Sequence, residues 1–319
     1  MIKAIKRIAK RIFIFLLIIF TIYLVISNID LIRDLATKEK INVVIDADAA
    51  NGTDDIFAIL RIMVHEDVEL RGLLSAQWRL ADLENDSTVS SNQLINTLIL
   101  DQFHKSHIRN KKGTALPLAY YENEDTGNEA SAAIIRTITE LPYGEKLNML
   151  CLGSATNLAG AILEKPEIAD KIICYIQGPY YDPSRRAWDK SDPVSRLDLE
   201  AVDILLNEDK LEIHLLPANV ASDMILDKNE LLEELTGTDT LMRFIKEHSL
   251  SGQSGTDPVE LNSLALVQAF LNADMSTQKQ LIAPPENHQR KIYVYTRIDV
   301  ERMIRDFIKS LTEKINPHN

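Results

Sequence analysis

From residue 41 onward, short runs of β-branched and aliphatic residues alternate with segments whose apolar residues recur at helical spacing. The alternation begins with a run at 41–45 and ends with a helical pattern at 300–314. Strands separated by helices of this length are joined by crossover connections, which place neighbouring strands parallel to one another. The sequence therefore predicts an α/β fold with an open, mostly parallel sheet flanked by helices.

The individual elements follow from the same two periodicities. Strands are expected at 41–45, 70–75, 147–152, 171–177, 211–216 and 291–296. Helices are expected at 54–65, 91–103, 129–140, 157–163, 198–207, 241–248, 263–271 and 300–314. Two stretches rich in Asp, Ser, Pro and Gly, 182–192 and 252–258, are expected to be loops that line a site. Because no internal repeat or long linker interrupts the pattern, a single domain is expected over 41–319.

The first forty residues have a different character. Residues 1–11 are basic and 12–29 carry no charge, and 30–40 is expected to be a linker. At about 1.5 Å per residue, the uncharged stretch is just long enough to cross a bilayer. Basic residues before it predict a cytoplasmic N-terminus, a membrane-spanning helix over 12–29 and an extracytoplasmic body. The alternative is a signal peptide cleaved near Ser27, which would leave a secreted protein.

The charge of the chain argues against one class of partner. The formal net charge is −12, and the five basic residues among the first eleven leave −17 on the remainder. Nucleic-acid binding needs a basic face, so we expect no nucleic-acid partner. The two cysteines, Cys151 and Cys174, lie in apolar runs. They indicate buried free thiols and give neither a disulfide framework nor metal-ligand spacing.

Four carboxylates follow the first expected strand within ten residues: Asp46, Asp48, Asp54 and Asp55. Ligands of open parallel sheets bind at the carboxyl ends of strands, where this segment lies. Four clustered anions are unfavourable unless they are solvated or a cation neutralises them, and oxygen ligands favour Ca²⁺ or Mg²⁺. The alternative is an exposed turn in which Thr53 or Asp54 caps the next helix. Capping leaves Asp46 and Asp48 without an explanation.

This acidic segment, 46–55, resembles the opening Asp-x-Asp-x-Gly-x-Asp-Asp motif of the inosine–uridine-preferring nucleoside hydrolases, with two additional residues in the turn. Segments 152–159, 164–168, 198–201 and 298–303 are similar to later blocks of that family, in the same order. The resemblance covers roughly residues 41–310. It implies a Rossmann-like nucleoside hydrolase fold and a calcium-dependent hydrolase that cleaves the N-ribosidic bond of a nucleoside-like substrate.

The resemblance also implies roles for individual residues. The implied ligands of Ca²⁺, with Mg²⁺ as the alternative ion, are Asp48, Asp55, the carbonyl oxygen of Thr156, and Asn262. Asp54 is implied as the general base that activates a metal-bound water, which would attack an oxocarbenium-like anomeric carbon. Asp46 is implied to support these groups from behind.

Substrate contacts are expected from Asn51 in the turn and from Trp78 and Arg79 after the second strand, where the family usually has Gly-Asn. Other positions depart from the family. Leu261 stands where a His linked to protonation of the leaving group is usual, Asn262 replaces an Asp, and 192–197 lacks the Asn of the ribose clamp. Two alternatives therefore stay open: a catalytically degenerate homologue that binds a sugar or nucleoside, or a metal-dependent hydrolase of another glycoside or a phosphoester. Homo-oligomer formation also stays open.

Overall fold

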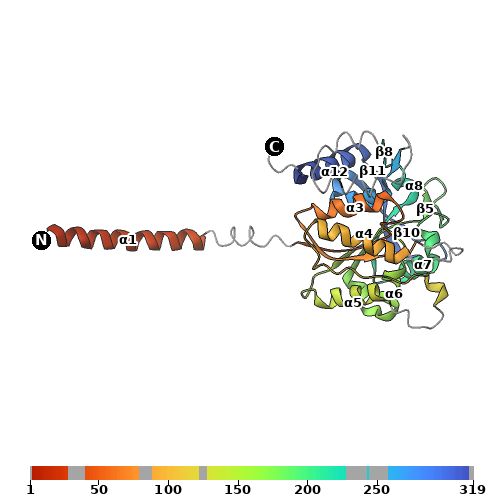
Figure 1. Ribbon diagram of the computed structural model, residues 1–319, viewed down its shortest axis with the longest axis horizontal. Coiled ribbons are helices and arrows are strands. Elements are labelled where there is room, and N and C mark those ends of the chain that lie inside the picture. Colours follow the sequence, from red (N-terminus) through yellow and green to blue (C-terminus); the bar gives the residue numbers. More distant parts are fainter. Residues whose placement is uncertain are drawn as a thin grey trace. The chain divides into compact units, whose positions relative to one another are not determined.

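The computed structural model describes residues 2–27, 40–78, 88–121, 128–227, 243 and 258–315 (Figure 1). The chain divides into two compact units, Met1–Lys40 and Ile41–Asn319. Each unit is described by itself below.

In the first unit, Ile2–Ser27 forms a single helix, α1. This helix begins within the basic segment, so the charged residues and the apolar stretch share one continuous element. Within the ranges that the structure describes, no helix has the length and apolar character needed to cross a bilayer. The expected membrane-spanning helix over 12–29, and with it the membrane as a partner, therefore lacks support.

The second unit is built on a seven-stranded sheet with the order β10-β11-β7-β4-β3-β1-β2. Its strands in chain order are β1 (Ile41–Ala47), β2 (Val68–Ser75), β3 (Leu147–Cys151), β4 (Ile172–Gly178), β7 (Glu212–Pro217), β10 (Ser276–Ile282) and β11 (Lys291–Ile298). Neighbouring strands run parallel except β10 and β11, which are antiparallel. The expectation of an open, mostly parallel α/β sheet is confirmed.

Helices cover both faces of this sheet (Figure 1). They are α3 (Thr53–Met63), α4 (Thr88–Gln102), α5 (Glu129–Glu140), α6 (Thr156–Glu164), α7 (Leu199–Asn207), α8 (Ala218–Ala221), α11 (Asn262–Leu271) and α12 (Val300–Ile315). Two buried apolar clusters lie on opposite faces of the sheet, because successive side chains of a strand point to alternate faces. Val43 and Ile45 of β1 belong to the cluster with α3, α11 and α12, whereas Val44 belongs to the cluster with α5, α6 and α7. The inner strands β1, β3 and β4 are largely buried on both faces, as parallel strands between helix layers must be.

Several elements depart from the expectations. No strand was expected at β10, because this edge strand is largely polar and exposed and shows little apolar alternation. The segment 182–192, expected to be a loop, contributes to a hairpin of β5 (Tyr180–Asp182) and β6 (Ala187–Asp189). A second short antiparallel pair joins β8 (Ile225–Leu226) and β9 (Val259–Glu260). The expected helix 241–248, apart from residue 243, and most of the expected loop 252–258 lie outside the described residues.

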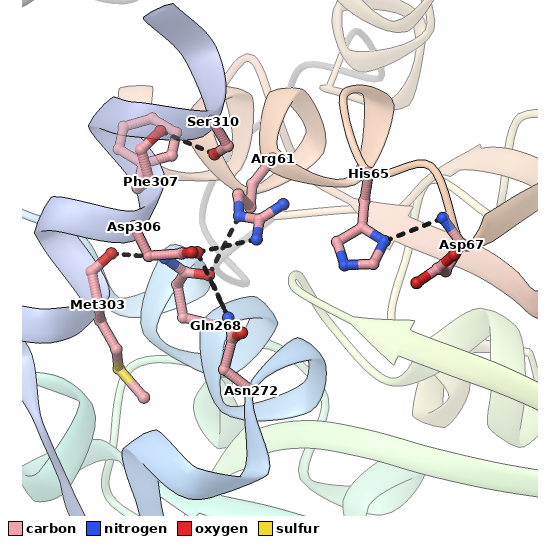
Figure 2. A network of polar contacts seen from close by, with 9 residues as sticks. All are labelled: Arg61, His65, Asp67, Gln268, Asn272, Met303, Asp306, Phe307 and Ser310. Carbon is pink, nitrogen blue, oxygen red and sulfur yellow. Dashed lines mark hydrogen bonds and ion pairs between the residues drawn. The ribbon is translucent and has the colours of Figure 1, made fainter. Parts of the chain in front are cut away.

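A buried polar network fastens α3, α11 and α12 together (Figure 2). Arg61 of α3, which is 4% exposed, donates from Nε to Oε1 of Gln268 at 3.2 Å and from Nη2 to Oδ2 of Asp306 at 2.8 Å. Asn272 donates to the same Gln268 oxygen at 3.1 Å. The network fixes α11 against α3 near their C-terminal ends, and the N-terminal turns of these two helices carry the site described next.

Candidate active site

A cavity of about 410 Å³ lies where β1, β3 and β4 end and where α3 and α11 begin. Its walls come from six separate segments of the chain. The lining residues are Asp48, Asn51, Gly52, Asp54, Asp55, Trp78, Leu152, Gly153, Gln177, Pro193, Val194, Arg196, Leu197, Asn262 and Ser263. The cavity therefore occupies the carboxyl edge of the sheet, which is the usual position of ligands in open α/β folds.

The turn between β1 and α3 is held by its own polar groups. The backbone N–H of Asp48 donates to Oδ2 of Asp55 at 2.8 Å, and Nδ2 of Asn51 donates to Oδ2 of Asp48 at 3.0 Å. Asn92 of α4 accepts from the backbone N–H of Ala50 at 2.7 Å. The N-cap residue of α3 is Gly52, which forms no side-chain cap. The N-cap position therefore lies at Gly52 and not at Thr53 or Asp54, where the alternative placed it.

Asp54 contacts the first turn of α11. Its Oδ2 accepts from the backbone N–H of Ser263 at 2.6 Å, and its Oδ1 accepts from the backbone N–H of Leu264 at 3.2 Å. The side chain of Ser263 lowers the pKa of the neighbouring carboxyl groups of Asp54 and Asp55. Unsatisfied N–H groups at a helix N-terminus favour a carboxylate, so α11 fixes the orientation of Asp54.

Burial nevertheless dominates the titration of the acidic cluster. Burial, followed by the charge of Asp55, raises the pKa of Asp54 to about 7. Burial also raises the pKa of Asp46 to about 7, and it raises the pKa values of Asp48 and Asp55 above their ordinary range. In the described part of the chain, no basic side chain forms an ion pair with any of the four. Such a cluster favours either a proton or a bound cation.

Asp46 is fully buried and does not line the cavity. Nδ2 of Asn157 donates to its Oδ1 at 2.9 Å, while its Oδ2 is buried without a partner among the described residues. Asn157 in turn accepts from Nδ2 of Asn128, the N-cap residue of α5, at 3.1 Å. Gly113 packs directly on this amide, because a Cβ there would lie 2.1 Å from Oδ1 of Asn157. Asp46 thus belongs to a polar network under the acidic turn.

Thr156 is the first residue of α6 and is buried beside the cavity without lining it. Its hydroxyl donates to Oδ2 of Asp198 at 2.7 Å. Asp198 also caps α7 through the N–H of Ala201 at 3.0 Å. Leu152 and Gly153, which precede Thr156, do line the cavity. A Cβ at Gly153 would lie 3.1 Å from Cγ of Asp48, so this glycine permits a close approach of the two segments.

The donor set around Asp48 and Asp55 fits a hard divalent cation. Asn262, at the start of α11, lines the cavity, and its Oδ1 is buried without a partner in the described part of the chain. Carboxylate and amide oxygens suit Ca²⁺ and Mg²⁺. Among the described residues, no three His, Cys, Asp or Glu side chains are grouped to hold a metal ion. A site here would therefore need amide or carbonyl oxygens in addition to the two carboxylates.

Two of the three residues expected to contact the substrate line the cavity. Asn51 and Trp78 line the cavity, and the half-buried Trp78 has an indole N–H without a partner within the described ranges. Arg79 lies outside the described residues. The expected site loop 182–192 contributes no lining residue, because the cavity wall is formed by residues 193–197 that follow it.

Sequence reasoning missed Gln177, Ser263 and Asn157. Gln177 is a polar residue near the end of a buried strand, and that position was the available signal. Asn157 lies inside the segment 152–159, but its partner Asp46 is 111 residues away in the chain. Neither the contact of Asn157 with Asp46 nor that of Gln177 with Ser263 can be predicted from local spacing.

An α/β sheet carries a cluster of carboxylates in a cavity at its carboxyl edge, an arrangement suited to acid–base or metal-assisted hydrolysis. The profile of the inosine-uridine preferring nucleoside hydrolase family matches residues 43–305. The chain belongs to this family and is a glycosyl hydrolase of the nucleosidase type.

Solved structures support the same fold. A plant nucleoside hydrolase, the PpNRh1 enzyme, is 17% identical with a TM-score of 0.65, covering 85% of this chain and 99% of that one. The inosine-uridine preferring nucleoside hydrolase from Bacillus anthracis is 18% identical with a TM-score of 0.64, covering 86% and 100%. A purine-preferring ribonucleoside hydrolase from Gardnerella vaginalis is 16% identical with a TM-score of 0.59, covering 85% and 98%. No curated protein matches the sequence significantly.

Proposed function

We propose that this chain hydrolyses the N-ribosidic bond of a nucleoside with Ca²⁺ as its cofactor and Asp54 as the general base. One observation carries the proposal. Three carboxylates, those of Asp48, Asp54 and Asp55, line one cavity without a basic partner in the described part of the chain, and burial raises the pKa of each. The unpartnered Oδ1 of Asn262 adds a neutral oxygen donor to the same cavity.

The residues that would hold the ion are Asp48, Asp55, Asn262 and the carbonyl group of Thr156. When bound, a divalent cation lowers the pKa of water and orients the sugar hydroxyls. Asn262 contributes an amide oxygen where a carboxylate would add a negative charge, so we expect weaker Ca²⁺ binding than an all-carboxylate site would give. Mg²⁺ is the alternative ion.

Asp54 is suited to accept a proton. Its raised pKa, about 7, matches the value that serves a general base near neutral pH. The backbone N–H groups of Ser263 and Leu264 fix the plane of the carboxylate, and each oxygen keeps a lone pair for a water molecule or a sugar hydroxyl. Asp46, joined to Asn157, supports the turn from beneath and takes no proton from the substrate.

Departure of the nucleobase is the demanding step for this site. Leu261 is fully buried and apolar, so it cannot protonate a leaving group, and no His is among the described residues that line the cavity. Loss of a general acid costs roughly 10²–10⁴ in rate when the leaving group is poor. We therefore expect faster turnover of p-nitrophenyl riboside than of inosine. Trp78 offers a planar surface for the leaving group.

The experiment is a panel of inosine, guanosine, uridine and p-nitrophenyl riboside with Ca²⁺, measured by release of reducing sugar. Asp54→Asn is expected to reduce the rate by roughly 10²–10⁴. Asp170→Asn, a matched change at an exposed carboxylate, is expected to leave the rate unchanged. Stabilisation by nucleoside without product would favour the binding homologue. Cleavage of p-nitrophenyl phosphate without cleavage of the riboside would favour a phosphoesterase.

A further inference from the structure

Gln177 is a buried amide in the wall of the cavity. It lies near the carboxyl end of β4 and is only 4% exposed, yet its side chain borders the cavity. Its Nε2 donates to the hydroxyl oxygen of Ser263 at 2.8 Å. Its Oε1 has no hydrogen-bond partner among the described residues. One end of the amide is therefore engaged, and the other end is available to a molecule in the cavity.

The orientation of this amide is set by a directional chain of hydrogen bonds. Nε2 of Gln177 donates to the hydroxyl oxygen of Ser263, and the backbone N–H of the same serine donates to Oδ2 of Asp54. A flipped amide would present Oε1 to Ser263 and would need the serine hydroxyl as its donor. Asp54 thus holds the backbone of Ser263, and the hydroxyl of Ser263 holds the amide nitrogen of Gln177.

The same chain places Gln177 beside the reacting part of a substrate. Ser263 bonds directly to Asp54 through its backbone N–H at 2.6 Å and directly to Gln177 through its hydroxyl at 2.8 Å. Ser263 therefore contacts both the carboxylate of Asp54 and the amide of Gln177. If Asp54 acts next to the anomeric carbon, a neighbouring hydroxyl of the sugar is the nearest donor that Oε1 of Gln177 can meet.

We propose that Gln177 is a specificity-determining residue whose Oε1 accepts a hydrogen bond from one hydroxyl of the substrate sugar, with Ser263 holding the amide in place. This inference rests on the proposed nucleoside hydrolase function and assigns the sugar contact within it. A buried amide that is fixed before the substrate arrives loses its partner when the hydroxyl is missing, so the site discriminates against the corresponding deoxynucleoside.

The test compares Gln177→Met with the wild type on inosine and on its 2′-deoxy, 3′-deoxy and 5′-deoxy analogues. Gln177→Met keeps the length of the side chain and removes the acceptor. We expect kcat/KM for inosine to fall roughly 10- to 100-fold, and we expect this penalty to shrink to about twofold for the one analogue that lacks the bonded hydroxyl. Equal penalties on inosine and all three analogues would overturn the proposal.

Three further variants separate binding from folding. Ser263→Ala is expected to weaken the same discrimination, and Ser263→Thr, which keeps the hydroxyl, is expected to restore it. Gln280→Met, at an exposed edge position, is expected to change neither activity nor discrimination. Melting temperatures of all variants within a few degrees of the wild type would show that the proteins are folded. If Gln177→Met melts earlier, the pair Ser263→Ala and Ser263→Thr supplies the comparison.

The failure of the proposed function has a different signature. If the wild type releases no sugar from any nucleoside, that function fails, and the Gln177 assignment is then tested by thermal shift with Ca²⁺ and ribose. The assignment would be supported if ribose stabilises the wild type but not Gln177→Met, and if one of the deoxyriboses fails to stabilise the wild type. Equal stabilisation of both proteins, or no stabilisation of either, would refute it.

Discussion

Gly113→Ala adds one methyl group at a position where the buried network under the acidic turn leaves no space. The new Cβ would lie 2.1 Å from Oδ1, 2.5 Å from Nδ2 and 2.6 Å from Cγ of Asn157. The amide of Asn157 must therefore move. It presently donates to Asp46 at 2.9 Å and to the carbonyl oxygen of Ser75 at 3.3 Å, and it accepts from Asn128 at 3.1 Å.

The magnitude follows from these contacts. Displacing the amide weakens three buried hydrogen bonds, and one of them reaches a fully buried carboxyl group whose other oxygen has no partner within the described ranges. Each buried polar group left unsatisfied costs about 1–3 kcal/mol. Because Asn157 can relax in part, we expect Gly113→Ala to reduce the free energy of unfolding by about 2–4 kcal/mol.

Denaturant unfolding followed by circular dichroism measures this loss. Gly72→Ala is the matched control, because a Cβ there makes ordinary contacts of 3.5–3.7 Å and is expected to change stability by less than about 1 kcal/mol. In an Asn157→Ala background the clash has no target, so the additional cost of Gly113→Ala should fall to the level of the control. A Gly113→Ala variant as stable as Gly72→Ala, or a cost unchanged in the Asn157→Ala background, would refute the reasoning.

Two other predictions concern parts of the fold away from the cavity. Arg61→Met leaves Asp306 and Gln268 without their buried guanidinium partner and should lower the free energy of unfolding by about 2–4 kcal/mol, with Asp306→Asn costing less; equal costs would contradict the network in Figure 2. His214 stacks between Tyr175 and Tyr293 at centroid distances of 4.6 and 4.7 Å, and burial lowers its pKa below 6.5. The unfolded chain takes up a proton near pH 6.5 that the folded protein resists, so His214 contributes a loss of stability as the pH falls below 6.5. The stability advantage of the wild type over His214→Phe should therefore shrink between pH 7.5 and pH 5, and an advantage that is constant with pH would contradict this.

The sheet was predictable because its signal is local. Each inner strand is a short β-branched or aliphatic run, as at Val43, Val44 and Ile45, and helical apolar spacing recurs between these runs. The acidic cluster was predictable for a similar reason, since its members lie within ten residues of one another. The edge strand β10 has no such signal, because one side of it meets solvent and its residues are mostly polar.

The supporting contacts of the site could not be predicted, because they join segments that are distant in the chain. Gln177 and Ser263 are 86 residues apart, and Asp54 and Ser263 are 209 apart. Which residues meet is decided by the strand order, in which β4 lies two places from β1, and by the packing of α11 against α3. Local periodicity carries no information about either arrangement.

Binding of Ca²⁺ measured by titration calorimetry at pH 7.5 tests the central claim most directly. We predict one ion per chain for the wild type, loss of binding in Asp55→Asn, and unchanged binding in Asp170→Asn. If the wild type binds no Ca²⁺ or Mg²⁺ at millimolar concentration, or if Asp55→Asn binds as tightly as the wild type, the buried carboxylates at the end of β1 do not form the metal site on which the proposed hydrolysis depends.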